Sequence, residues 1–138
     1  MRICLDTNIW LSAVFWSGEA NKLINIIKAK KLELVITKKI LLEIVDVLNK
    51  ESKFQKFIED RNLAVKDLIR TILYISEMVI SNSELNIIKE HHSDNKILES
   101  AVDGNVDYLI SYDNHLLKLK EYKNIKIITP QEFLEKHN

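Results

Sequence analysis

The opening stretch MRICLDTN, residues 1–8, places an acidic side chain directly after a short apolar run. The run Ile3-Cys4-Leu5 is typical of a buried strand, and Asp6 closes it. A carboxylate beside a hydrophobic core is unfavourable unless a positive charge compensates it. This stretch therefore predicts both the first strand of a sheet and a binding site at its end.

Three further acids stand at comparable places. Glu43 lies inside the helical pattern of residues 40–45, Asp94 opens another helix, and Asp113 follows the strand-like run 108–110. Carboxylate oxygens are the ligands that hard divalent cations prefer. Four carboxylates at the ends of elements, in a chain of 138 residues, suggest a site for such a cation.

Size and composition favour one domain over residues 1–138. Apolar residues make up 46% of the chain, which is enough for a substantial core, and 29% of the residues are charged. Twenty basic residues balance twenty acidic ones, so a global basic field that attracts nucleic acid is excluded. Any binding of nucleic acid must use a local patch.

The sequence also indicates a cytoplasmic protein. The single Cys4 excludes an internal disulfide framework and fits a reducing compartment. No apolar run approaches the roughly 18 residues that a membrane helix needs, so no membrane association is expected. The chain reaches Asp6 too soon for a secretory signal peptide.

Apolar runs alternate with helical patterns along the chain. Strands are expected at residues 1–5, 32–36, 106–110 and 125–128, with a weak candidate at 87–88. Helices are expected at residues 19–30, 38–49, 93–103 and 114–119, with one or two more within 52–76 and a last one from residue 130. This alternation predicts an α/β fold with a mainly parallel central sheet.

Helix boundaries are marked by particular residues. Thr37 and Ser93 are suitable N-caps, and Gly104 can serve as the residue after the last turn of its helix. The tetrapeptide Thr129-Pro130-Gln131-Glu132 has the pattern of a capping box with proline at the first helical position. These signals predict where the helices begin and end.

The predicted architecture brings the acids together. Asp6 and Asp113 each follow a strand, so both lie at the carboxyl edge of the sheet, where open α/β sheets bind ligands. Asp94 begins a helix at the same edge, and Glu43 can reach back toward the start of its own helix. We therefore expect one acidic cluster built from four separate segments.

Five segments resemble motifs of the PIN-domain family, and the resemblance extends over essentially the whole chain, with residues 52–83 the least diagnostic part. The segments are LDTN at 5–8, LLEIVDVL at 41–48, DNKILESA at 94–101, VDYLISYDNHLL at 106–117 and ITPQEFL at 128–134. The last segment is similar to the ending of a bacterial and archaeal subgroup regarded as toxins of toxin–antitoxin pairs. Each motif alone is weakly specific, whereas their order and spacing together are strongly so.

The resemblance implies a three-layer α/β/α fold and a metal-dependent endoribonuclease that uses Mg²⁺ or Mn²⁺. It places the catalytic acids at Asp6, Glu43, Asp94 and Asp113. Asp6, Asp94 and Asp113 would be metal ligands, with Glu43 orienting the attacking water. Asn8 and Ser111 match polar positions that support these acids. The implied partners are an RNA substrate, a cognate antitoxin protein, and further copies of the chain in a homodimer or higher oligomer.

Two positions depart from the family pattern. Tyr112 stands where many relatives have glycine directly before the last aspartate, and His91-His92-Ser93 stands where many have a further acid. Adjacent histidines point apart, so a solvated loop explains His91 and His92 better than a metal pair does.

The same residues allow other interpretations. Asp94 could simply favour the positive end of a helix and Asp113 could simply cap one. A catalytically inactive PIN-like module that binds RNA or protein is the main alternative function, and a general metal-dependent phosphatase is another. The complete set of four acids argues against an inactive module.

Two further groups have more than one explanation. A basic group can meet RNA phosphates or form a solvated face equally well; its members are Lys28, Lys30, Lys31, Lys38 and Lys39. Trp10 and Trp16 lie on the apolar stretch of residues 9–16, where a core or dimer contact is favoured over stacking on bases.

Overall fold

A computed structural model describes residues 1–15, 18–82, 84–85, 87–88 and 93–137. The described strands are β1 (Arg2–Leu5), β2 (Glu33–Thr37), β3 (Glu77–Val79), β4 (Tyr108–Ile110), β5 (Glu121–Tyr122) and β6 (Ile125–Ile128). The described helices are α1 (Thr7–Phe15), α2 (Glu19–Ala29), α3 (Lys38–Lys50), α4 (Ser52–Asp60), α5 (Val65–Ile75), α6 (Ser93–Asp103), α7 (Asn114–Leu117) and α8 (Pro130–His137).

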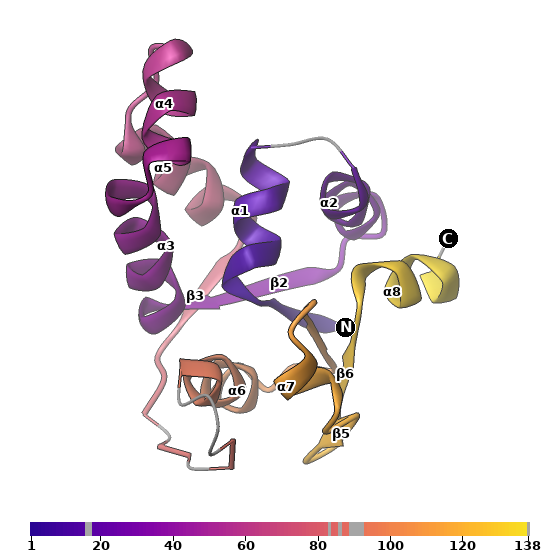
Figure 1. The fold of residues 1–138 in the computed structure, drawn as a ribbon. Helices are drawn as coiled ribbons and strands as arrows, with labels where there is room; N and C mark the ends of the chain where they lie inside the picture. Colours follow the sequence, from indigo (N-terminus) through magenta and orange to yellow (C-terminus); the bar gives the residue numbers. More distant parts are fainter. Residues whose placement is uncertain (16–17, 83, 86, 89–92, 138) are drawn as a thin grey trace.

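The strands form one sheet in the order β3-β2-β1-β4-β6-β5, in which only β5 runs antiparallel. Figure 1 shows α1 and α2 on one side of this sheet and α6 and α7 on the other, with α3 closing one flank. Helix α8 packs against α2 at the other flank. The α/β fold with a mainly parallel sheet in three layers is therefore confirmed.

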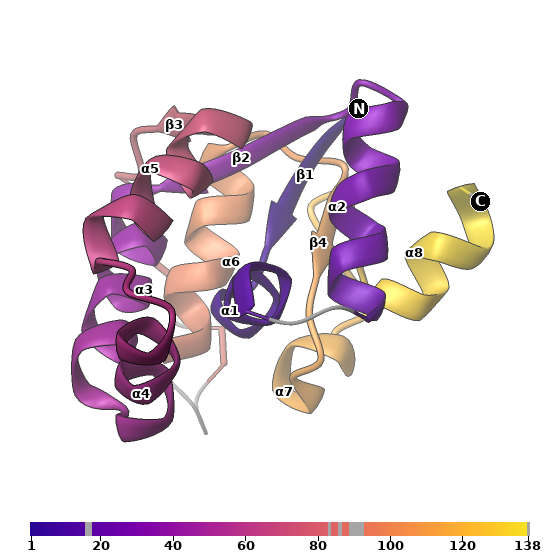
Figure 2. The ribbon, with the colours of Figure 1, turned by 90° about the horizontal axis from the view of Figure 1, so that it is seen from above.

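The strand order reverses between β1 and β4. From β1 the chain moves outward to β2 and β3, then crosses back to β4 on the other side of β1. Ligand sites of open α/β sheets lie at such a switch point, beyond the carboxyl ends of the strands. Figure 2 shows that β1 ends where α1 begins, and that α7 and the first turn of α6 lie at this same edge.

Two predicted helix starts have the expected hydrogen bonds. The Thr37 hydroxyl accepts from the Ile40 amide at 3.4 Å and caps α3. Before α8, the Thr129 hydroxyl accepts from the Glu132 amide at 3.2 Å, and a Glu132 carboxylate oxygen accepts from the Thr129 amide at 3.4 Å. This reciprocal pair is a capping box, so the sequence prediction of both boundaries is confirmed.

Gly104 was predicted as the left-handed residue after α6, and this prediction is wrong. Asn105 takes the left-handed conformation, with φ 55°, and the Val106 amide bonds to the Ala101 carbonyl across it. Gly104 has another role: a Cβ built on it would lie 2.6 Å from Cγ1 of Val35. The absence of a side chain at this position allows α6 to approach β2 closely.

Sequence reasoning also misplaced the edge strand. Ile87 and Ile88 are not in a strand; their amides instead donate to the Asn95 side-chain oxygen at 3.1 and 3.0 Å. The edge position belongs to β3, and the short β5 was also not predicted. The stretch 52–76 contains two helices, which is one of the two predicted outcomes.

The apolar faces of the sheet and helices meet in one buried cluster. Trp10 is fully buried within it, as the interpretation of its apolar stretch favoured, while Trp16 lies outside the described residues. Among the helices that the structure describes, none is long and apolar enough to cross a membrane.

Candidate functional site

Asp6 is a nearly buried carboxylate at the carboxyl end of β1, with only 8% of its surface exposed. Its amide extends the sheet by donating to the Ile110 carbonyl at 3.0 Å. One carboxylate oxygen, Oδ1, accepts from the Thr7 amide at 2.7 Å, and the other, Oδ2, accepts from the Ser111 hydroxyl at 2.6 Å. Two donors therefore fix the orientation of this carboxylate.

Ser111 connects Asp6 to Asp113. Its own amide donates to the Ile128 carbonyl at 3.0 Å, which holds the residue at the end of β4. Its hydroxyl oxygen accepts from the Asp113 amide at 2.9 Å. Asp113 Oδ1 in turn accepts from the His115 amide at 2.8 Å and caps α7. Asp113 is thus a helix cap, and its position is fixed relative to Asp6.

The site concentrates negative charge around Asp6. Burial raises the pKa of the Asp6 carboxyl, and the charge of Asp113 raises it further, while the hydrogen bonds from Ser111 and Thr7 act in the opposite direction. Burial likewise raises the pKa of Glu43, and the charge of Asp6 adds to this effect. Asp113 is therefore near enough for its charge to act on Asp6, and Asp6 is near enough for its charge to act on Glu43.

Glu43 lies on α3 with one carboxylate oxygen, Oε2, buried and without a hydrogen-bond partner among the described residues. The buried Thr7 hydroxyl on α1 likewise has no hydrogen-bond partner of good geometry among the described residues. This hydroxyl nevertheless lies near enough to Glu43 to lower its pKa, as does the charge of Lys96 on α6. Buried polar atoms of this kind are commonly satisfied by a ligand, an ion or water.

Asp94 is 5% exposed in the first turn of α6, at the edge of the sheet that also holds Asp6 (Figure 2). Within the described part of the chain, no three His, Cys, Asp or Glu side chains stand close enough together to hold a metal ion. Asn8 is exposed on α1. His91 and His92 lie outside the described residues.

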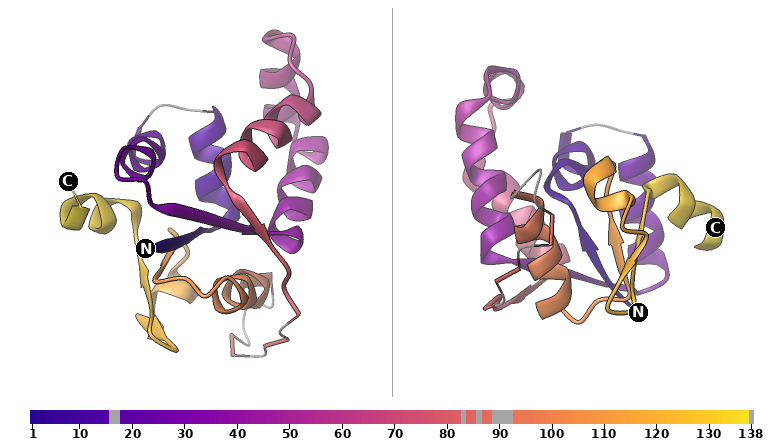
Figure 3. Two further views of the ribbon diagram at one scale, coloured as in Figure 1. Left: turned by 180° about the vertical axis from the view of Figure 1, so that it is seen from behind. Right: turned by 60° about the horizontal axis from the view of Figure 1, so that its bottom comes forward.

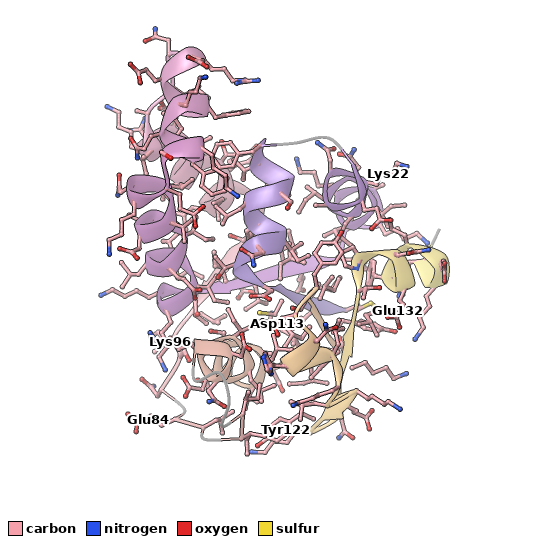
Figure 4. All side chains as sticks on the ribbon, in the orientation of Figure 1. Lys22, Glu84, Lys96, Asp113, Tyr122 and Glu132 are labelled. Atoms are coloured by element: carbon pink, nitrogen blue, oxygen red, sulfur yellow. The ribbon has the colours of Figure 1, made fainter. Side chains whose placement is uncertain are left out.

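A polar pocket of about 770 Å³ opens beside Glu43, between α3 and α6. Lys39 and Glu99 form an ion pair of 2.7 Å in its wall, and the other oxygen of Glu99 accepts from the Leu85 amide at 2.7 Å. Lys96 also lines the pocket, and Figure 4 shows it and Asp113 beside α6 and α7. Of the four candidate acids, Glu43 is the one that lines this pocket, so the pocket meets the site at Glu43 beside Lys96.

The basic group expected from the sequence does not form one patch. Lys28, Lys30 and Lys31 precede β2, whereas Lys38 and Lys39 follow it. A strand of this length spans about 17 Å, so the two subsets lie at opposite edges of the sheet. Only Lys38 and Lys39 are on the edge that carries the acids.

Three residues near the site were not singled out from the sequence. Thr7 follows Asp6 directly, and the alternation of strand and helix could have placed it at the start of α1. Lys96 follows Asp94 by two residues, and its approach to Glu43 depends on how α3 and α6 pack. Glu99 and its ion pair depend on the same packing.

The donor set fits a hard divalent cation. Buried carboxylates that lie near other acids are stabilised when a cation binds beside them. Asp6, Glu43 and Asp113 supply carboxylate oxygens here, and Oε2 of Glu43 has no hydrogen-bond partner of good geometry among the described residues. Because no three acidic groups of the described residues are within joint reach of one ion, side-chain movement would accompany binding.

Comparison with known proteins places this geometry in context. A family model described as PIN domain matches residues 2–115. The fold is similar to the crystal structure of VapBC2 from Rickettsia felis bound to a DNA fragment from their promoter. That similarity has a TM-score of 0.64 and 17% identity, and covers 92% of this chain and 97% of the other. No functionally curated protein matches this sequence.

Proposed function

The chain belongs to the PIN-domain family, and on that premise we propose that it is a metal-dependent endoribonuclease, the toxin of a toxin–antitoxin pair. One observation carries the proposal: a buried Asp6 at the switch point of the sheet is oriented by Ser111 and coupled in charge to Glu43 and Asp113. A purely structural aspartate would gain no stability from the nearby negative charges of two other acids.

We assign the residues as follows. Asp6 and Asp113 would hold Mg²⁺ or Mn²⁺ most directly, and Asp94 would join them directly or through water. The bound ion would supply the positive charge that activates water and offsets charge on the reacting phosphate. Asn8 and Ser111 would support these acids, and for Ser111 the two hydrogen bonds to Asp6 and Asp113 favour that role.

Glu43 would act on the attacking water. Its raised pKa allows its carboxylate to take up a proton near neutral pH more readily than an ordinary glutamate does. The water oxygen would bond to phosphorus, the bond from phosphorus to the 3′-oxygen would break, and solvent would protonate that oxygen. The products would be a 5′-phosphate and a 3′-hydroxyl.

Lys96 would guide the RNA backbone to this site. It lines the pocket beside Glu43 and is exposed, so a phosphate can reach its ammonium group. Because the net charge of the chain is zero, local cations of this kind must provide the attraction for RNA. We place the reaction in the cytoplasm, where a lone buried cysteine such as Cys4 remains reduced.

The similarity of fold to VapBC2 from Rickettsia felis supports an antitoxin partner for this chain, and we propose one. An antitoxin would have to restrain the nuclease by binding near the acidic edge. Co-expression of the chain with the product of a neighbouring gene, followed by co-purification, would test this part of the proposal.

The central experiment incubates the purified protein with a mixed RNA pool in Mg²⁺, Mn²⁺ or EDTA, beside Asp6→Asn. Metal-dependent cleavage that disappears in the variant is expected. Asp60→Asn is a matched control, because Asp60 is exposed at the end of α4 and does not line the pocket beside Glu43. Equal behaviour of wild type and Asp6→Asn in all conditions would contradict the proposal.

A binding measurement separates catalysis from metal capture. Saturating Mg²⁺ or Mn²⁺ at one hundred times its dissociation constant stabilises a binding-competent fold by about 2.7 kcal/mol. We expect this increase in thermal stability for wild type and its loss in Asp6→Asn. RNA binding without any turnover or metal stabilisation would instead support the inactive module, which the absence of a ready three-acid arrangement among the described residues favours.

A further inference from the structure

An exposed aromatic ring stands among the acids of the site. Of the aromatic side chains that the structure describes, Tyr112 and Tyr74 are the exposed ones, at 48% and 90%. Tyr74 is on α5 just before β3, at the amino edge of the sheet. Tyr112 lies at the opposite, carboxyl edge, between Asp113 and the Ser111 that bonds to Asp6. Its ring is therefore partly open to solvent at the edge that carries the acids.

Hydrogen bonds hold this tyrosine on both sides along the backbone and at its hydroxyl. The Ser111 amide donates to the Ile128 carbonyl at 3.0 Å, and the Asp113 amide donates to the Ser111 hydroxyl oxygen at 2.9 Å. The Tyr112 hydroxyl donates to Glu19 Oε2 at 3.2 Å, in the first turn of α2. Burial raises the pKa of Tyr112, and the bond to Glu19 raises it further, so this hydroxyl keeps its proton at neutral pH. The ring is thus held in place without a ligand.

Tyr112 and Lys96 lie on opposite sides of Asp6. Strand β1, which ends just before Asp6, lies between β2 and β4 in the sheet. Helix α3 follows β2 and carries Glu43, whose pKa is lowered by the charge of Lys96, whereas Tyr112 follows β4. Figure 2 and the right view of Figure 3 show α7, which begins directly after Asp113, between α6 and α2. A strand of RNA that crosses this edge therefore meets a cation on one side of the acids and an aromatic face on the other.

On the premise of the proposed nuclease function, we propose that the Tyr112 ring is a stacking platform for an unpaired base of the nucleotide beside the scissile phosphate. The face of an aromatic ring stacks on any base, because every base has a flat π-face. An unpaired base can turn this face toward a protein, whereas in a duplex neighbouring base pairs cover it. The substrate class is therefore single-stranded RNA, including the loops of folded RNA.

The position of the ring favours this role. A side chain already held at its hydroxyl loses little conformational freedom when a base stacks on it. Consecutive Cα atoms are about 3.8 Å apart, so Tyr112 stands within reach of a nucleotide whose phosphate meets Asp113. Tyr112 is also a position at which this sequence departs from the family pattern, so the stacking platform is a feature of this chain.

Binding without turnover tests the platform first. The probe is a fluorescein-labelled single-stranded RNA of about twelve nucleotides in EDTA, followed by fluorescence anisotropy. Tyr112→Leu should lower affinity by about 5–150-fold, the usual effect of losing one stack between a base and an aromatic ring. Tyr112→Phe keeps the ring and should retain most of the affinity. Tyr74→Leu is the matched control, because it removes the other exposed tyrosine, and should bind as wild type does.

A fluorescent base separates stacking from a general disturbance of the fold. The base 2-aminopurine, placed in the same RNA, loses fluorescence when an aromatic ring stacks on it. We expect this quenching with wild type and Tyr112→Phe, and its reduction with Tyr112→Leu at saturating protein. The same RNA in a duplex should bind wild type and Tyr112→Leu equally. No quenching by wild type, or an equal loss of affinity for the duplex, would overturn the proposal.

Cleavage in Mg²⁺ or Mn²⁺ distinguishes this inference from the proposed function. Tyr112→Leu should raise KM for single-stranded RNA by the factor seen in binding, with kcat and the stabilisation by metal largely unchanged. Binding that depends on Tyr112, with no cleavage in any metal, would support the stacking platform and reject the nuclease. Binding and cleavage by Tyr112→Leu equal to those of wild type would retain the nuclease and overturn the stacking platform.

Discussion

The Ser111 hydroxyl donates to Asp6 Oδ2 at 2.6 Å, joining residues 105 positions apart in the chain. Both residues stand at the carboxyl ends of neighbouring parallel strands, since β1 pairs with β4. The same hydroxyl oxygen accepts from the Asp113 amide at 2.9 Å. One small side chain thus sets the spacing of two of the four acids.

Ser111→Ala should therefore reduce metal binding and cleavage more than the loss of a single hydroxyl group suggests. The variant leaves Asp6 Oδ2 and the Asp113 amide without their partner, and removes a bond that lowers the pKa of Asp6. We expect metal affinity or cleavage to fall by about 10–100-fold, the usual effect of losing a residue that orients a metal ligand. Titration with Mn²⁺ and RNA cleavage would measure this, and Ser111→Thr, which keeps the hydroxyl, should recover part of the loss.

Asp6→Asn should raise stability while it removes activity. The folded protein keeps a buried carboxylate that its neighbours disfavour, because both burial and Asp113 raise its pKa. An asparagine can keep the bond from the Thr7 amide and direct its own amide toward Ser111. Thermal unfolding at pH 7 in EDTA should give a midpoint equal to or above that of wild type. A clearly lower midpoint would show that the charge itself stabilises the fold.

The stability of the metal-free protein should fall as pH rises through the weakly acidic range. The pKa of Glu43 in the folded state is raised above its ordinary value of 4.5. The folded state therefore holds a proton that the unfolded state has already released, and the stability present at low pH is lost as pH rises through the raised pKa.

Comparison with Glu43→Gln isolates this effect. The free energy of unfolding of wild type minus that of the variant should decrease from about pH 4.5 upward in EDTA, as measured by urea denaturation at several pH values. A difference that does not change with pH, or changes in the opposite sense, would contradict the raised pKa.

Lys96→Gln should weaken RNA binding and shift the pH dependence of cleavage. In EDTA, where no cleavage is expected, affinity should fall severalfold, and the salt dependence should become shallower by about 0.7 in log–log slope for one lost phosphate contact. Because Lys96 lowers the pKa of Glu43, its loss should also move the acid limb of the cleavage profile to higher pH. Lys96→Arg should retain binding. Lys56→Gln, exposed on α4, should change neither quantity.

Gly104→Ala and Asn105→Gly should act in opposite directions. The alanine Cβ would lie 2.6 Å from Val35 Cγ1, so we expect a loss of about 1–3 kcal/mol from overpacking. Asn105 has φ 55°, which glycine adopts without strain, so its substitution by glycine should be neutral or mildly stabilising. Urea unfolding of both variants would show whether the left-handed position is residue 105. A clearly destabilising Asn105→Gly would contradict the left-handed conformation at residue 105.

Several features were predictable because they depend on neighbours in the chain. The apolar run before Asp6 requires a buried strand, and the Thr129–Glu132 spacing is sufficient to predict the capping box before α8. The motifs at residues 5–8, 41–48, 94–101 and 106–117 likewise indicated the family that the comparison confirmed. That residues 1–138 form one domain, and that the four acids act together in catalysis, stay predictions.

Tertiary structure decided what local pattern could not. Periodicity does not distinguish Ile87-Ile88 from β3 as the edge strand, because both are short apolar runs and only packing against β2 selects one. The close approach of α6 to Val35 explains the glycine at position 104, and this contact between distant segments is not visible in the local pattern. Lysines that are near in sequence were separated by the length of β2, and Lys96 reached Glu43 through the packing of α6 on α3. Sequence by itself determined which residues end each element, and the packing of distant elements decided which of those ends face one another.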